Sequence, residues 1–133
     1  MNDECRTMDA NTERQRDLRE RTKEFALRIV RLYAALPKTT EAQVLGKQAL
    51  RSSTSVGANY REATRARSTA EFVSKVGVGL QELEETDYWL GLLADSGIVP
   101  EARLTDLHNE LDELTAILVS SVKTTKKRMG GDK

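Results

Sequence analysis

The sequence predicts an all-α protein, folded as an antiparallel up-down-up-down four-helix bundle. Gly and Pro number only 8 and 2 in 133 residues, whereas the good helix formers Ala, Leu, Glu, Arg and Lys are abundant. Apolar residues recur at steps of three and four, the spacing that places them on one face of a helix. Helix-ending signals divide this pattern into four long segments with short connections, and short connections favour antiparallel neighbours.

The first helix is expected over residues 13–36. Its apolar stripe includes Leu18, Phe25 and Ile29, which share one face at helical spacing. Pro37 follows, and it ends the helix because proline has no backbone N–H to continue the hydrogen-bond ladder.

The second helix is expected over residues 41–65, although this segment is rich in Ser, Thr and Gly. On a helical wheel its small and apolar residues gather on one side and its charged residues on the other, and a loop has no reason to sort in this way. Thr40 with Gln43 predicts a capping box at its start. The predicted buried face consists of Leu45, Ala49, Ser52, Val56, Asn59, Tyr60 and Ala63.

The third and fourth helices have similar signals. Ser68 with Glu71 predicts a second capping box, which begins the third helix. Gly97 supplies the left-handed backbone that ends it. Pro100 fits the first turn of the fourth helix, whose leucines recur at steps of three and four.

The helices define the expected domain boundaries. Residues 13–123 form the four-helix bundle domain. Residues 1–12 are predicted to be a disordered leader and residues 124–133 a basic flexible tail, because polar chain ends are poorly ordered unless they are packed.

The net charge is zero, but the charges are unevenly distributed. Residues 1–75 hold 15 Lys and Arg against 10 Asp and Glu, whereas residues 76–133 hold 6 against 11. Faces of opposite charge suit nucleic acid or contacts between subunits. No apolar run is long enough for a membrane span, the amino-terminal residues lack a signal peptide's apolar segment, and Cys5 has no cysteine partner. We therefore expect a cytoplasmic protein.

A basic stripe on the second helix is the candidate nucleic-acid-binding site, because Lys and Arg neutralise phosphates. The alternatives are a solvated helix face and pairing with the acidic helices of a neighbouring subunit. No aromatic residue shares this face, so base stacking is not indicated. With the end of the chain included, the candidate residues are Lys47, Arg51, Arg61, Arg65, Arg67, Lys126, Lys127 and Arg128.

Two other groups of residues have structural predictions. Asn59 and Glu62 are three apart and predict a structural polar network that fixes helix register, with a functional site as the alternative. A second apolar patch on the third helix predicts an oligomer interface, unless Trp89 only widens the internal core. The candidate interface residues are Val78, Glu82, Glu85, Trp89 and Leu92.

Residues for catalysis or metal binding are not grouped as those functions require. His108 is the only histidine, and it is not part of the Glu-x-x-His motif of di-iron bundles. The sequence has no credible Cys/His pair for nucleophilic catalysis. We expect no enzyme, no metal site, no cofactor and no small-molecule substrate.

Over residues 22–123 the chain resembles the small bacterial four helix bundle protein family, which includes the 23S rRNA intervening-sequence proteins. The stretch "QALRSSTSVGANYREA", with Asn59 and Glu62, matches the pattern of the family's second helix. The stretch "RSTAEFVSKVGVGLQELEET", with Ser68 and Phe72, matches the pattern that opens its third helix. The family in turn resembles accessory proteins of diversity-generating retroelements, which form homopentameric barrels and bind nucleic acid.

The resemblance implies a homopentamer that binds structured RNA or DNA. The alternative function is a protein-interaction scaffold, whose acidic region between Glu82 and Glu113 would bind a basic partner protein.

Overall fold

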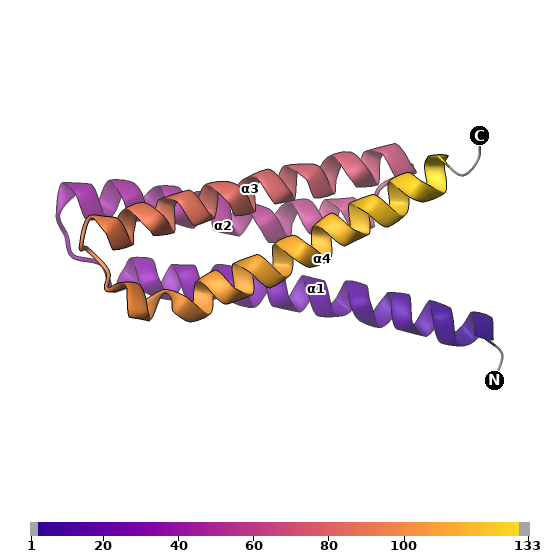
Figure 1. Cartoon of the computed structure of the whole chain (residues 1–133), viewed down its shortest axis with the longest axis horizontal. Coiled ribbons are helices and arrows are strands. Elements are labelled where there is room, and N and C mark those ends of the chain that lie inside the picture. Colours follow the sequence, from indigo (N-terminus) through magenta and orange to yellow (C-terminus); the bar gives the residue numbers. More distant parts are fainter. Residues whose placement is uncertain (1–2, 131–133) are drawn as a thin grey trace.

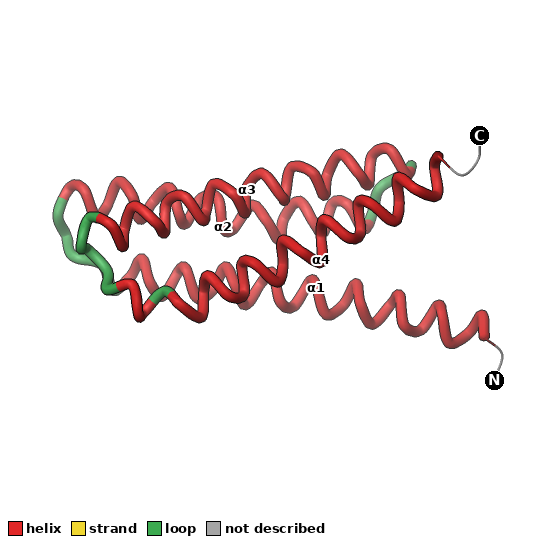
Figure 2. Tube along the Cα trace, viewed as in Figure 1, coloured by secondary structure: helices red, strands yellow, loops and turns green. Residues whose placement is uncertain are grey.

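Four long helices make up the chain in the computed structural model, which describes the backbone of residues 3–130 and the side chains of residues 15–130. Helix α1 spans Asp3–Ala34, α2 spans Thr40–Thr64, α3 spans Thr69–Asp95 and α4 spans Thr105–Gly130, and a short 3-10 helix, η1, covers Glu101–Arg103. No strand occurs between residues 3 and 130 (Figure 2), so this part of the chain is all-helical, as predicted.

The helices lie along the long axis of the molecule (Figure 1). The α1–α2 and α3–α4 connections are at one end, and the α2–α3 connection is at the other, near both termini. Helix α2 packs most extensively against α3 and also against α1, whereas α4 packs mainly against α3. Helices α2 and α4 are therefore diagonal, and α1 and α4 diverge toward the termini.

One hydrophobic core runs through the bundle. In α2, most of the predicted face is buried, while Leu45 and Asn59 are half-buried. Between residues 3 and 130, none of the helices has an apolar stretch of the length that a membrane span requires. The largest fully buried apolar side chains are Phe25, Ile29, Val56, Val76, Leu83, Leu90, Leu93, Leu104, Leu114 and Leu118.

Small residues bring α2 close to its neighbours. A Cβ atom added at Gly46 would lie 2.5 Å from Leu36 Cδ1 and 2.8 Å from Tyr33 Cδ2. Between α2 and α3, the fully buried hydroxyls of Ser52 and Thr86 share a hydrogen bond of 2.7 Å. The Ser, Thr and Gly content of α2 therefore serves close helix packing, because small side chains let two backbones approach.

The start of α2 differs from the prediction by one residue. Thr39 is the N-cap, and its Oγ1 accepts a hydrogen bond from the amide of Ala42 at 3.3 Å. The predicted capping box of Thr40 and Gln43 is wrong, because the side-chain amide of Gln43 instead donates to the carbonyl of Pro37 at 2.9 Å. Gln43 thus holds the α1–α2 connection rather than a free amide of α2.

Ser68 is the N-cap of α3, as predicted, although the Glu71 carboxylate reaches the amide of Arg67 rather than that of Ser68. The amide of Glu71 donates to Ser68 Oγ at 3.1 Å, and the Glu71 carboxylate accepts from the amide of Arg67 at 3.3 Å. Gly97 has the left-handed φ of 77° that ends the α3 turn. Pro100 is not in the first turn of α4, because it has extended backbone and precedes η1.

Both outer helices are longer than predicted. The backbone is helical from Asp3, before the expected start near residue 13, and α4 continues to Gly130. The mobility predicted for residues 1–12 and 124–133 stays a prediction. The side chain of Cys5, residues 1–2 and residues 131–133 lie outside the described part of the molecule.

Candidate functional site

Most of the predicted basic stripe lies on the solvent face of α2. Lys47, Arg61 and Arg65 are exposed, and so is Arg67 in the α2–α3 connection. None of these four forms an ion pair with another side chain of residues 15–130. Their charges are therefore available to an anionic ligand, because no carboxylate of that part of the chain neutralises them.

Arg51 differs from the rest of the stripe. Its Nη2 lies 3.0 Å from Glu85 Oε1 and its Nη1 lies 3.5 Å from Glu82 Oε2. The acidic partner of this arginine is therefore α3 of its own chain. The two carboxylates neutralise Arg51, and they remove it from the group of free cations.

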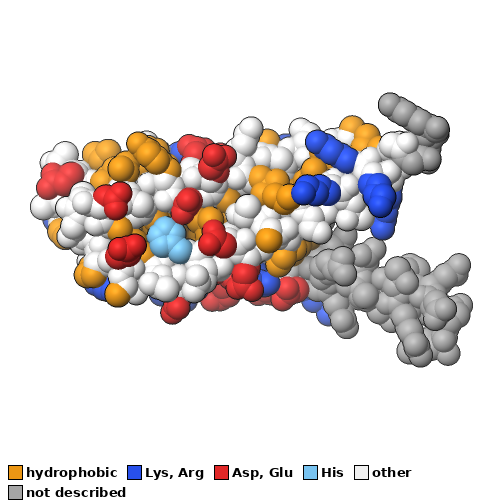
Figure 3. All heavy atoms as spheres, in the orientation of Figure 1, with side chains coloured by type: hydrophobic (Ala, Val, Ile, Leu, Met, Phe, Trp, Pro, Cys, Tyr) orange, Lys and Arg blue, Asp and Glu red, His pale blue; other side chains and the backbone are white. Residues whose placement is uncertain are grey.

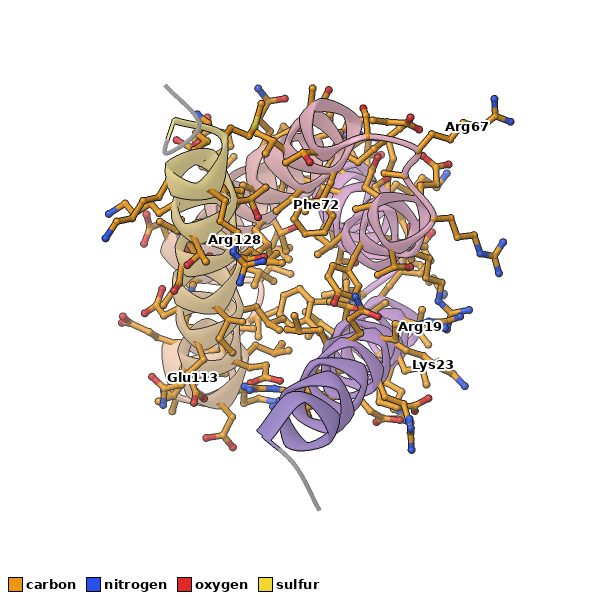
Figure 4. All side chains as sticks on the ribbon, turned by 90° about the vertical axis from the view of Figure 1, so that its right-hand side faces the viewer. Arg19, Lys23, Arg67, Phe72, Glu113 and Arg128 are labelled. Atoms are coloured by element: carbon orange, nitrogen blue, oxygen red, sulfur yellow. The ribbon has the colours of Figure 1, made fainter. Side chains whose placement is uncertain are left out.

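Helix α1 supplies two cations that the sequence interpretation did not include. Arg19 and Lys23 are four residues apart and point to the same side of the molecule as Arg67 (Figure 4). Thr22 lies between them in the sequence. Its Oγ1 would be 3.2 Å from a Cβ atom added at Gly57, which places this turn of α1 against α2. Residues 15–130 include no ion-pair partner for Arg19 or Lys23.

The electrostatics of Tyr60 place Arg19 near the same part of α2. Burial raises the pKa of Tyr60, and the positive charge of Arg19 opposes this rise. Arg61 directly follows Tyr60 in α2. We call the resulting group the basic α1–α2 surface, and it consists of Arg19, Lys23, Lys47, Arg61, Arg65 and Arg67.

Of the basic residues that the structure describes at the chain end, only Arg128 borders a hollow together with a residue of this surface, Arg67. Lys126, Lys127 and Arg128 are exposed on the last turns of α4, which is diagonal to α2. Figure 3 shows blue side chains gathered at this end of the molecule. Arg128 points toward the centre of the bundle end, where Phe72 also lies (Figure 4).

Asn59 and Glu62 do not form the predicted pair. Asn59 Nδ2 donates to the carbonyl of Ser55 at 2.9 Å, within its own helix. Glu62 is exposed, and its carboxylate lies 2.8 Å from Nζ of Lys75 in α3. The two residues belong to separate contacts, because Asn59 bonds within α2 whereas Glu62 pairs with a residue of α3.

The predicted interface residues lie along the outer side of α3. Val78 is exposed, whereas Trp89 and Leu92 are half-buried, and Trp89 packs against the internal core. Tyr88, which the prediction did not include, is 60% exposed and makes an edge-on contact with the Trp89 ring. Trp89 therefore has one side against the core, and Tyr88 offers the larger exposed aromatic surface.

Carboxylates surround this part of α3. Burial raises the pKa of Glu82, the negative charge of Glu85 adds to the rise, and Arg51 opposes it. His108 Nδ1 lies 3.2 Å from Asp87 Oδ1, and red side chains surround the single pale-blue histidine in Figure 3. In the part of the chain that the structure describes, no three His, Cys, Asp or Glu side chains are placed to hold a metal ion.

Comparison with known proteins gives a family and a related structure. Residues 14–120 match the sequence model of a family described as 23S rRNA-intervening sequence protein. A crystal structure from Bacteroides thetaiotaomicron, described as a protein with unknown function from the S23 ribosomal protein family, is 40% identical. It aligns with a TM-score of 0.75, covering 80% of this chain and 98% of that chain. No curated protein matches the sequence.

Proposed function

The chain belongs to the family of 23S rRNA-intervening sequence proteins, and from this premise we propose that it is a non-enzymatic, homo-oligomeric four-helix bundle protein that binds structured RNA. The binding site is the basic α1–α2 surface. One observation carries the proposal: six cationic side chains of α1, α2 and the α2–α3 connection have no ion-pair partner among residues 15–130.

Phosphate neutralisation is the chemistry that this surface supports. Each phosphate that is neutralised releases counterions, so affinity falls as salt rises. The six residues include no aromatic side chain, so the surface would contact the RNA backbone and recognise its shape rather than stack on its bases. The ribosomal names of the family and of the related structure agree with an RNA ligand.

The remaining features of the proposal concern the assembly. We propose the antiparallel up-down-up-down arrangement, supported by the alternating ends of the connections in Figure 1. We propose a homopentamer formed through the outer side of α3, supported by the exposure of Val78 and Tyr88. We also propose a cytoplasmic location. Light scattering should give about five subunits, and a stable monomer at micromolar concentration would contradict the interface.

The test of RNA binding uses two variants of the same helix. Arg61→Gln with Arg65→Gln removes two free cations, whereas Arg51→Gln removes a cation that Glu82 and Glu85 already neutralise. Binding of a structured RNA fragment is measured by fluorescence anisotropy from low to moderate salt.

The double variant should lower affinity about tenfold or more, and its log–log salt slope should fall by about two. Arg51→Gln should lower affinity only about twofold, because Arg51 is already paired with Glu82 and Glu85 and its loss acts on RNA only through the net charge. Equal losses in the two variants, or binding that salt does not weaken, would contradict the proposal.

A second candidate function is a protein-interaction scaffold. It is supported by the exposed Tyr88 ring among carboxylates of the Glu82–Glu113 region, a surface suited to a basic peptide. Tyr88→Ala should weaken binding of a basic peptide and leave RNA binding unchanged. The Arg61→Gln, Arg65→Gln double variant should weaken RNA binding and leave peptide binding unchanged.

A further inference from the structure

The end of the bundle that carries both termini contains a hollow with a volume of about 590 Å³. Helix α1, the carboxyl-terminal end of α2, the start of α3 and the last turns of α4 surround it, where α1 and α4 diverge (Figure 1). A second hollow of about 540 Å³ adjoins it and shares Gln15, Phe72, Thr125 and Arg128. Each volume is in the range of small-molecule sites, about 300–1,000 Å³.

One side of the larger hollow is apolar and aromatic. Its lining includes Leu18, Tyr60, Phe72 and Ile117. Phe72 is half-buried against the core and points toward the centre of the bundle end (Figure 4). An aromatic ring in this position offers a face on which a flat ring system can stack.

The other side is polar and cationic. Ser120, Ser121 and Thr124 of α4 contribute hydroxyl groups, and Arg128 contributes a guanidinium that points toward Phe72 in Figure 4. Among residues 15–130, whose side chains the structure describes, no Asp or Glu lines either hollow. Arg67 lines the second hollow, but its guanidinium points away from Arg128 (Figure 4). The ligand is therefore expected to be an anion with an aromatic part.

From this geometry we infer that the hollow binds a single nucleotide unit. The base stacks against Phe72, and the phosphate pairs with Arg128 beside the α4 hydroxyls. A guanidinium pairs with phosphate oxygens in a charge-assisted geometry, and aromatic stacking is tolerant of base identity. The site lies apart from the six residues of the basic α1–α2 surface except for Arg67. The unit could be a free mononucleotide or the end of an RNA strand, and in the second case the inference rests on the proposed RNA binding.

The first experiment titrates the full-length protein with adenosine 5′-monophosphate by isothermal titration calorimetry. Adenosine and ribose 5-phosphate are the matched controls, because each lacks one of the two groups that the hollow recognises. The mononucleotide should bind about tenfold or more tightly than either control. No binding of the mononucleotide at millimolar concentration, or equal binding of ribose 5-phosphate, would overturn the inference.

Variants then locate the site. Arg128→Gln and Phe72→Leu should each lower the affinity for the mononucleotide about tenfold. Lys123→Gln should leave this affinity unchanged, because Lys123 is exposed on α4 and does not line the hollow. Circular dichroism checks the fold of Phe72→Leu, and Arg128→Gln leaves the core intact because Arg128 is exposed. Unchanged affinity in Arg128→Gln would overturn the inference.

The last comparison separates the two sources and the two proposals. A 5′-phosphorylated tetranucleotide that binds more tightly than the mononucleotide indicates a strand end, and the reverse order indicates a free nucleotide. The Arg61→Gln, Arg65→Gln double variant should keep its affinity for the mononucleotide even if its affinity for structured RNA is lost. The double variant could instead keep its affinity for structured RNA while Arg128→Gln no longer binds the mononucleotide. That result would support the nucleotide site in the hollow and contradict RNA binding at the basic α1–α2 surface.

Discussion

Replacing Gly46 with alanine should destabilise the protein, although alanine is the better helix former. Gly46 is buried in α2. The new Cβ would lie 2.5 Å from Leu36 Cδ1 and 2.8 Å from Tyr33 Cδ2, well inside the 3.5–4.0 Å at which carbon atoms attract. The neighbours of Gly46 therefore have to move.

Their movement is restricted. Leu36 is only 5% exposed, and the Tyr33 hydroxyl is held by a hydrogen bond of 2.9 Å to Gln43 Oε1. Overpacking of this kind costs about 1–3 kcal/mol, and the helix propensity of alanine offsets roughly 0.5–1 kcal/mol. We expect Gly46→Ala to lower the free energy of unfolding by about 1–2 kcal/mol.

Gly77→Ala is the matched control. It lies within α3, where an added Cβ meets nothing within 4 Å, so only the propensity gain remains. It should raise the free energy of unfolding by about 0.5–1 kcal/mol. Urea unfolding followed by circular dichroism measures both variants. A Gly46→Ala protein as stable as Gly77→Ala would refute the close-packing explanation.

The remaining predictions concern a cap, an ion pair and pH. Thr39→Ala should cost about 1 kcal/mol by loss of the α2 cap, whereas Thr40→Ala should have little effect; the reverse order in thermal melts would favour the capping box at Thr40. Arg21 of α1 donates through Nε to Glu110 Oε2 of α4 at 3.2 Å, so Arg21→Gln should lower stability by up to about 1 kcal/mol and speed hydrogen exchange in α1. Equal exchange in both proteins would contradict this role. The folded-state pKa of Glu82 is raised above its ordinary 4.5, so the folded state binds a proton more tightly, and stability should fall as pH rises from 4.5 through the raised pKa. In Glu82→Gln the free energy of unfolding should fall less over this pH range, as measured by urea titrations at a series of pH values. If its pH dependence is unchanged, other groups cause the fall.

Much of the fold could be predicted from the sequence because its signals are local. The α3 cap at Ser68, the turn at Gly97 and the four apolar stripes each depend on residues within a few turns of one another. Thr39 and Thr40 are both good caps, and only the competing contact of Gln43 with Pro37 distinguishes them. Pro100 was misplaced because extended backbone before η1 gives no distinct pattern.

The site was less predictable because it depends on contacts between helices. The charge of Arg51 could be seen in the sequence, but its partners Glu82 and Glu85 are on another helix. Arg19 and Lys23 have the i, i+4 spacing of a shared helix face, yet the sequence does not say which side of α1 meets α2. The hollow near Phe72 arises from the divergence of two helices far apart in the chain, which no local pattern encodes.

The close pairing of α2 with α3 has a consequence for how the chain folds. These two helices are consecutive, with only residues 65–68 between them, so their contacts close the shortest loops available to any pair in the bundle. Local contacts are associated with rapid folding, and we expect the α2–α3 hairpin to form the structured part of the folding transition state. Substitutions at Ser52 or Thr86, which meet between these helices, should then slow folding, whereas changes in the amino-terminal half of α1 should mainly speed unfolding.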